Sequence, residues 1–509
     1  MSRCVRRCVA AMRFALPPSA SEPSFCRSSR TPYARRARDV RHTAHSRGHE
    51  LIAQIAAWRS RLSRLHPDHL RIARGAIWIS TFVLLGKVAA ALREMAIAYH
   101  YGISPVVDAY QLTFNLITFL PAAFVVGLQI MLVPTLVGLR TQPVREQARF
   151  LGELQMVALV FGSVCATALL VAWPWVLGLF ERNLSGQTRE MSRAMMMTMS
   201  PIGILMMTIC VFAARLQARE RHINTLLEAL PAVVVLLFLI VWQQGNSPAP
   251  LMWGTTIGFL LQAAWLAALA RATDGVQTRF FFSLRSPQWS RNYRTVGMFM
   301  LCQLVLSLAV PLDQYFVAGL GDGAIATLSY SGRLIALLEG VGAMAIGRAT
   351  LPVFSDIQSN GEPARAREMA LKWSFLMLGV GVLVTAIVWP LAPIVIKLIF
   401  QHGAFTDADT ATVAHLVRWS LVKLPFYFAQ LVLLQLFASE GRLKALAGMA
   451  IVCFIVKALA NVVLIQWLGI VGIVLASAAS AASAFAYHLS LMGWDRHVRT
   501  VTRSGKRKS

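Results

Sequence analysis

Long hydrophobic runs recur along the chain from residue 73 onward, and short polar or basic stretches separate them. A helix of about 20 apolar residues crosses the ~30 Å hydrocarbon core of a bilayer. The runs do not alternate polar and apolar residues, which argues against a membrane β-barrel. They predict spans near 73–99, 109–137, 151–180, 191–213, 223–243, 249–270, 295–320, 323–354, 371–400, 410–438, 445–467 and 470–492. The predicted fold is therefore an all-α polytopic membrane protein with about 12 transmembrane helices.

Basic residues are distributed unevenly between the connecting segments. In one alternate set, the segments 100–107, 244–248, 321–322, 401–409 and 468–469 have no Lys or Arg. The remaining segment of that set, 181–190, breaks the pattern, but its Arg182 and Arg189 are balanced by Glu181 and Glu190. The other set is rich in them: Arg140, Arg145, Arg149, Arg215, Arg219, Arg221, Arg271, Arg279, Arg285, Arg291, Arg294, Arg365, Arg367, Arg442 and Lys444. Cytoplasmic loops carry the excess of Lys and Arg in membrane proteins. Both termini are therefore predicted to be cytoplasmic, which requires an even number of spans.

The long basic segment 271–294 divides the predicted spans into two sets of six. Residues 132–136 (Leu-Val-Pro-Thr-Leu) resemble residues 350–354 (Thr-Leu-Pro-Val-Phe), in the second span of each set. Two halves that enter the membrane from the same side form a parallel repeat, and such repeats enclose a binding site between them. We therefore expect an N-terminal lobe at 72–270 and a C-terminal lobe at 295–492, with a cavity between them.

Composition agrees with a membrane protein. Of the 509 residues, 56% are hydrophobic and 14% are charged, and the mean hydropathy is +0.58. Soluble proteins usually carry about 25% charged residues. The net charge of +26 is concentrated near the ends and in loops, and residues 1–74 alone hold sixteen Arg and four acidic residues. Residues 1–71 are predicted to be a disordered cytoplasmic extension and 493–509 a basic cytoplasmic tail, and no nucleic-acid partner is expected.

The sequence holds no motif typical of an enzyme. It has no Walker-type loop, no Gly-rich dinucleotide motif and no cluster of His, Cys and Asp, and its seven Cys residues are scattered. No catalytic residue, metal site or bound cofactor is therefore expected, although coupling to the membrane potential or to a cation stays open.

Ionisable side chains within the predicted spans carry the strongest functional signal, since they are costly at membrane depth and usually face a cavity or a partner. Lys87, Arg93 and Arg333 lie in the first two spans of the two halves, where they would line the cleft. Arg suits phosphate because it presents a planar, permanently charged fork of donors. These three residues predict an anionic substrate, while ion pairing between helices remains the structural alternative. Glu94, Asp313 and Lys457 are further candidates.

Several of these stretches resemble one known family. They are Gly86-Lys87-Val88 with Ala91-Leu92-Arg93-Glu94, then Tyr101-Gly102, Asp108-Ala109-Tyr110, Leu328 through Leu334, and Phe400 through Thr406 with Asp409-Thr410. Together they are similar to motifs of the MurJ (MviN) lipid II flippases. That family belongs to the multidrug/oligosaccharidyl-lipid/polysaccharide exporter superfamily, and the similarity spans about residues 72–492.

The resemblance implies two lobes around a cationic cavity that binds the diphosphate and head group of lipid II. It implies phosphate-binding roles for Lys87, Arg93 and Arg333. It also matches Asp108 to the family's acid at the mouth of the second span, so Asp108 is expected among the substrate-binding residues. The sequence differs from the family in two respects. Pro121 and Ala122 stand where the family often has a basic pair, and the family commonly has fourteen helices.

The expected function is translocation of an undecaprenyl-diphosphate-linked glycan across the bacterial inner membrane by alternating access. Three alternatives remain: a flippase for an exopolysaccharide or O-antigen unit, a cation-coupled multidrug exporter, and a scaffold without transport activity. A drug exporter for cations would favour an acidic cavity, which the basic excess opposes. The expected partners are the lipid-linked glycan, membrane lipids and enzymes of cell-wall or polysaccharide synthesis.

Overall fold

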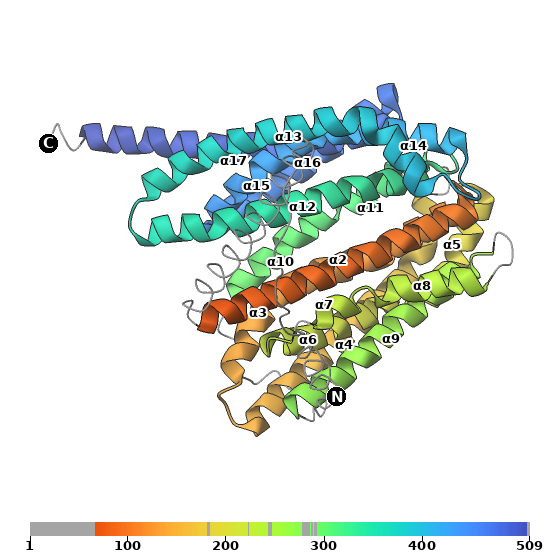
Figure 1. The fold of residues 1–509 in the computed structure, drawn as a ribbon, viewed down its shortest axis with the longest axis horizontal. Helices are drawn as coiled ribbons and strands as arrows, with labels where there is room; N and C mark the ends of the chain where they lie inside the picture. Colours follow the sequence, from red (N-terminus) through yellow and green to blue (C-terminus); the bar gives the residue numbers. More distant parts are fainter. Residues whose placement is uncertain are drawn as a thin grey trace, which may run out of the picture. The chain divides into compact units, whose positions relative to one another are not determined.

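The computed structural model describes residues 67–180, 184–221, 223–242, 247–276, 286, 289 and 293–505. These residues form helices and no strand (Figure 1). The chain divides into two compact units, 1–74 and 75–509, and the described helices lie in the second unit apart from the first turns of α2. The predicted extension lies outside the described residues as far as residue 66, and so does most of the predicted linker 271–294.

Eight helices come from the first half of the chain: α2 (Pro67–Tyr101), α3 (Pro105–Leu139), α4 (Val144–Leu179), α5 (Gly186–Met199), α6 (Ile202–Ala218), α7 (Ile223–Leu227), α8 (Leu230–Val241) and α9 (Ala249–Asp274). The second half forms α10 (Tyr293–Ser307), α11 (Ala309–Ala318), α12 (Ala324–Ser359), α13 (Pro363–Phe400), α14 (Asp407–Ser420), η1 (Leu421–Lys423), α15 (Leu424–Ser439), α16 (Leu443–Leu468) and α17 (Ile470–Gly505). Because α17 extends to Gly505, the basic tail begins as a helix.

Each of the twelve predicted spans coincides with one helix or with a broken helix. Within the described residues, ten segments are long and apolar enough to cross a membrane, and the bent pair α5 and α6 makes an eleventh. The charged helix α2 matches the first predicted span but is not among these. The polytopic all-α fold is therefore confirmed, and the count of twelve spans stays a prediction.

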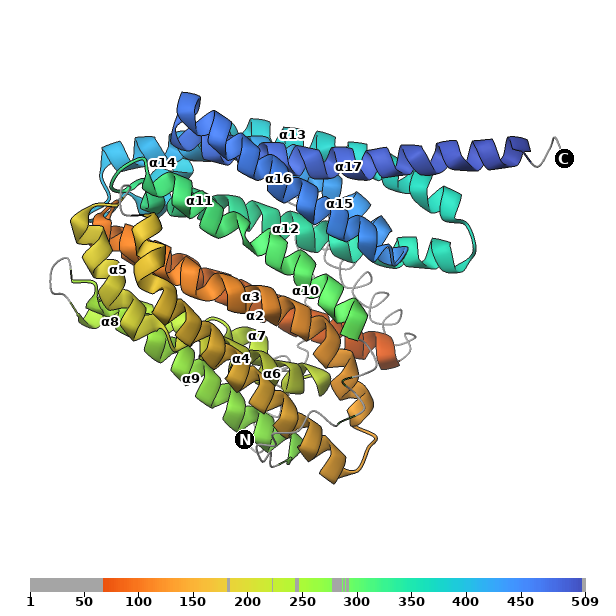
Figure 2. The same ribbon diagram turned by 180° about the vertical axis from the view of Figure 1, so that it is seen from behind.

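The two halves share one packing pattern. In the first half α3 packs against α5 and α6, and α4 packs against α6; in the second half α12 packs against α14 and α15, and α13 packs against α15. The fourth span of each half is broken: it consists of α5 and α6 in the first half, and of α14, η1 and α15 in the second (Figure 2). A proline lies at the start of the helix that follows each break. This correspondence supports the internal repeat at 132–136 and 350–354.

Local chemistry explains these breaks. Pro201 stands between α5 and α6, whose axes differ by 41°, and Pro425 stands in the first turn of α15. Proline cannot donate a backbone hydrogen bond and crowds the preceding turn of a helix. The helix before each break starts with a capped N-terminus: the Ser185 side chain accepts from the Thr188 backbone N–H, and Thr406 forms a capping box with Asp409.

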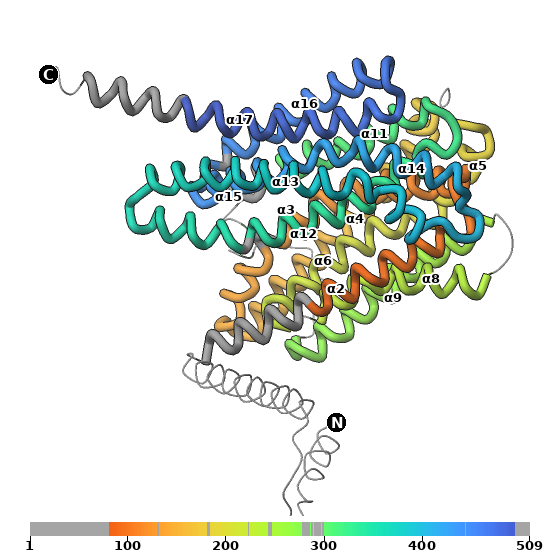
Figure 3. The backbone as a smooth tube through the Cα atoms, turned by 45° about the horizontal axis from the view of Figure 1, so that its top comes forward, coloured from red at the N-terminus to blue at the C-terminus, as the bar shows by residue number. Residues whose placement is uncertain are grey.

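Helix α3 joins the halves, because it also packs against α10, α11 and α12 (Figure 3). The largest buried cluster accordingly contains residues of both halves, among them Tyr110 on α3 and Tyr330 on α12. At the other side of the second half, α16 and α17 run side by side. The predicted substrate-binding residues lie on α2, α3 and α12. Because α3 packs against α12, and Glu94 of α2 pairs with Arg333 of α12, these three helices lie where the two halves meet.

Candidate functional site

Two arginines from opposite halves of the chain meet at one carboxylate. Glu94 on α2 is 4% exposed, and its Oε1 pairs with the guanidinium of the adjacent Arg93. The same oxygen lies 3.3 Å from Nε of Arg333 on α12. One carboxylate shared by two guanidiniums leaves an excess positive charge, which favours an additional anion. We call Arg93, Glu94 and Arg333 the arginine cluster.

Some polar atoms of the arginine cluster have no hydrogen-bond partner within the described part of the chain. Among the described residues, Nε of Arg93 and Oε2 of Glu94 are buried without a hydrogen-bond partner. The Arg333 side chain is 41% exposed, so part of its donor fork is open. Buried polar groups of a native protein are nearly always paired, so unpaired ones indicate a missing ligand or water. The donors of Arg93 and Arg333 can accordingly bind an oxyanion between the two halves, whereas Oε2 of Glu94 is an acceptor and suits a hydrogen-bond donor such as water.

Lys87 lies beside the cluster. It lines a cavity of about 420 Å³ within the first half of the chain, and Arg93 lines the same cavity. Helices α2, α3, α6, α7, α8 and α9 supply its other walls. Of the three predicted phosphate-binding cations, Arg93 and Arg333 therefore meet at Glu94, and Lys87 faces the adjoining cavity.

Asp108 sits in a different environment from the arginine cluster. It lies in the first turn of α3, is 2% exposed, and accepts backbone N–H groups of Gly323 and Ala326, the latter at 2.6 Å. These amides belong to the N-terminus of α12, where free N–H groups and the helix dipole favour a negative charge. The Asp108 carboxylate therefore caps a helix of the opposite half.

The motif around residues 400–406 packs against the end of α2. Ala404 donates its N–H to the Tyr99 carbonyl at 2.8 Å, and the Tyr330 hydroxyl donates to the Gly102 carbonyl at 3.0 Å. A Cβ on Gly102, whose φ is +54°, would lie 2.6 Å from the Ala404 carbonyl oxygen. Glycine is thus required there for both conformation and space. This motif joins the halves, so its part in the resemblance is structural.

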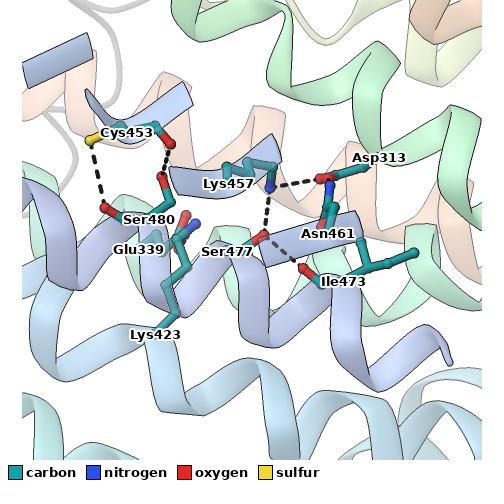
Figure 4. Close-up of polar contacts among 9 residues, drawn as sticks. All are labelled: Asp313, Glu339, Lys423, Cys453, Lys457, Asn461, Ile473, Ser477 and Ser480. Atoms are coloured by element: carbon teal, nitrogen blue, oxygen red, sulfur yellow. Dashed lines mark hydrogen bonds and ion pairs between the residues drawn. The ribbon is translucent and has the colours of Figure 1, made fainter. Parts of the chain in front are cut away.

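A second polar network lies in the second half (Figure 4). Nζ of Lys457 on α16 is 2.8 Å from the Asp313 carboxylate on α11 and donates to the Ser477 hydroxyl on α17 at 2.6 Å. Asn461 donates its amide to the other Asp313 oxygen at 2.9 Å. The predicted candidates Asp313 and Lys457 are therefore partners. Nearby, Lys423 pairs with Glu339 at 2.7 Å, and both lysines line a cavity of about 460 Å³.

Sequence reasoning missed some polar residues at these sites. Asn224 and Gln262 are buried and line the cavity beside Arg93; an uncharged amide in an apolar run gives no signal that separates a binding residue from a packing one. Arg215, counted as a loop charge, is buried and pairs with Asp274 at 2.7 Å. The described residues hold no group of three or more His, Cys, Asp and Glu arranged for a metal ion.

Comparison with known proteins places this architecture in a family. The model of the family described as "Lipid II flippase MurJ" matches residues 97–501. A probable lipid II flippase MurJ of Bdellovibrio bacteriovorus is 26% identical over 444 residues, which cover 82% of each chain. A probable lipid II flippase MurJ of Synechocystis is 28% identical over 429 residues, covering 79% of this chain and 78% of the relative.

Solved structures show the same fold. A lipid II flippase MurJ in an inward closed conformation aligns with a TM-score of 0.69 at 16% identity, covering 82% of this chain and 87% of that one. An inward-facing multidrug resistance MATE family transporter of the MOP superfamily aligns with a TM-score of 0.65 at 14% identity, covering 82% and 95%. The chain is thus a multi-pass protein of the bacterial inner membrane, and it belongs to the lipid II flippase MurJ family.

Proposed function

We propose that this protein moves an undecaprenyl-diphosphate-linked glycan of the lipid II type across the inner membrane by alternating access, without covalent chemistry. The arginine cluster is the observation that carries this proposal. It places two permanent positive charges, one from each half of the chain, around a single buried carboxylate. A diphosphate presents more oxygens and more negative charge than that carboxylate, so it can bridge both arginines.

In the proposal, the arginine cluster also links binding of the diphosphate to the movement of the two halves relative to each other. Glu94 and Arg333 form an ion pair between α2 and α12. In the proposed cycle the diphosphate takes over the Arg333 donors, which weakens the direct pairing of the halves and lets them rock around the bound head group. A ligand shifts a conformational equilibrium by its differential affinity for the two states, and here that difference comes from the separation of the two arginines.

Coupling to the membrane potential or to a cation is part of the proposal. The pair of Asp313 and Lys457 supports placing it in the second half, because it joins α11 to α16 through a carboxylate and an ammonium that are both largely shielded. Moving one elementary charge across 100 mV changes the free energy by about 2.3 kcal/mol, so a shift of either group through the field would drive a conformational change.

The charge of the cavity disfavours one alternative. The likeness to a multidrug transporter concerns the fold, and a cationic drug would be repelled by the net positive arginine cluster. In the proposal, enzymes that make the lipid-linked glycan supply the substrate. The names of the relatives support lipid II rather than an exopolysaccharide or O-antigen unit as that substrate.

Reconstitution tests the function. Proteoliposomes that contain the full chain should move lipid II from one leaflet to the other faster than protein-free liposomes do. Proteoliposomes with a lipid-linked O-antigen unit run in parallel test the substrate. Equal rates of lipid II movement with and without protein would contradict the proposal. If only the lipid-linked O-antigen unit moves faster with protein, that lipid and not lipid II is the substrate.

A further inference from the structure

The cavity beside the arginine cluster is lined by both aromatic and polar side chains. Phe114 on α3 and Phe259 on α9 line it, with ring centroids 6.4 Å apart. Its neutral and acidic polar groups come from Asn224, Thr225, Glu228, Gln129 and Gln262. Ligand pockets are typically apolar with a few placed polar groups and span about 300–1,000 Å³. At about 420 Å³ this cavity fits a small polar ligand.

Asn224 is buried in the lining of this cavity. It is 1% exposed, and among the described residues neither its amide nitrogen nor its amide oxygen has a hydrogen bond. A buried amide in that state costs folding free energy, and an isosteric apolar residue would avoid the cost. Both a donor and an acceptor are therefore left for something that enters the cavity.

The break between α7 and α8 presents these groups. Asn224 and Glu228 are four residues apart, so they lie on one face of the helical turn that ends at the break. Glu228 is close enough to Lys87 to interact electrostatically. The lining therefore combines an amide, a carboxylate and an ammonium with two aromatic rings. These groups are suited to the hydroxyl groups and the apolar ring face of a sugar.

We propose that this cavity binds the sugar that is attached directly to the diphosphate, with Asn224 as a specificity-determining residue. The inference rests on the proposed function, because Arg93 lines the cavity and belongs to the arginine cluster. A diphosphate held at Arg93 and Arg333 therefore places its first sugar next to Asn224. The cavity selects lipids that carry a sugar over lipids that end in the diphosphate.

The test measures dissociation constants of the full chain in nanodiscs for two probes, lipid II and undecaprenyl diphosphate without a sugar. Asn224→Leu keeps the number and branching of the side-chain heavy atoms and removes the unpaired amide, and the adjoining cavity can take up the bulkier methyl groups, so the fold should tolerate it. We expect it to weaken lipid II binding about tenfold and to leave undecaprenyl diphosphate binding within about twofold. Thr208→Val, on α6 outside the cavity lining, should change neither constant.

A variant of the arginine cluster separates the two hypotheses. Arg93→Ala should weaken both probes, because both carry the diphosphate. If Asn224→Leu changes neither constant, or weakens both equally, the sugar pocket is overturned while the effect of Arg93→Ala still supports the diphosphate site. If Arg93→Ala leaves both constants unchanged, the proposed diphosphate site is overturned.

Discussion

Glu94 on α2 and Arg333 on α12 form an ion pair with 3.3 Å between Oε1 and Nε, although they come from opposite halves of the chain. The pair gives the two halves a direct electrostatic link at the point where the substrate is proposed to bind. Arg93 shares the same carboxylate oxygen. In the proposed cycle, the arginine cluster would therefore couple substrate binding to the separation of α2 and α12.

Removing either arginine should abolish transport. Arg93→Ala and Arg333→Ala each leave the diphosphate with one donor fork. Truncating a partner of a buried charge pair costs about 2–5 kcal/mol, and Arg333→Ala should lie at the lower end because its side chain is 41% exposed. Arg333→Lys should rescue part of the rate, since it keeps the charge and loses the planar fork. Rates of lipid II movement in proteoliposomes, normalised to inserted protein, provide the measurement.

Arg365→Ala is the matched control for these variants. Arg365 pairs with Glu362 at 2.9 Å in the first turn of α13, and both side chains are exposed. Exposed pairs contribute about 0–1 kcal/mol. This variant should transport normally, and full activity of both Arg93→Ala and Arg333→Ala would mean that the cluster is a structural ion pair.

Glu94→Gln should lower the stability of the fold, and added anions should restore part of that stability. The neutral amide leaves two neighbouring guanidiniums without a counter-ion, and breaking a buried pair costs about 3–5 kcal/mol. Added inorganic pyrophosphate should raise the Tm of this variant more than that of the unchanged protein, because the anion takes the place of the carboxylate. Equal pyrophosphate shifts in the two proteins would show that the arginines do not form an anion site.

We expect Asp108 to contribute to stability and not to substrate binding. Asp108→Ala leaves the α12 amides without their acceptor, and loss of such a cap costs about 0.5–2 kcal/mol. Asp108→Asn keeps an acceptor and should cost less. Thermal unfolding in detergent measures the stability, and transport per folded molecule should stay near normal in both variants. A large loss of transport with an unchanged Tm would instead assign Asp108 to the substrate.

Variants of the Asp313 and Lys457 pair should distinguish an effect on stability from an effect on coupling to the membrane potential. Lys457→Met leaves a carboxylate without its cation and should destabilise by about 3–5 kcal/mol. Asp313→Asn combined with Lys457→Met removes both charges and should recover most of that loss. We expect the double variant to respond less to an imposed membrane potential than the unchanged protein does. A double variant with an undiminished response would place the coupling elsewhere.

Topology can be checked directly. Reporter fusions after residues 104, 246 and 405 should give a periplasmic signal, because their loops belong to the set without Lys or Arg. Fusions after residues 142 and 361, in loops of the other set, should read as cytoplasmic. A cytoplasmic signal at two of the first three positions would rule out twelve spans with both termini inside.

The fold class and the positions of the helices could be predicted from the amino-acid sequence alone. A run of apolar residues long enough to cross the bilayer must satisfy its own backbone hydrogen bonds, so it forms a helix wherever it occurs. That constraint is local, and every predicted span therefore meets a helix at nearly the predicted residues. The sequence also singled out Arg93 and Arg333, because a charge inside an apolar run is conspicuous without any knowledge of packing.

The partner of each charge, in contrast, emerges only from the packing of the folded chain. Asp108 and Glu94 are both acids in adjoining spans, yet one caps α12 and the other holds two arginines. Asn224 is a candidate because, within the part of the chain that the structure describes, its buried amide has no hydrogen-bond partner, and no sequence pattern records this. These differences arise from contacts between residues far apart in the chain, and such contacts depend on how helices rotate and cross rather than on the composition of either helix.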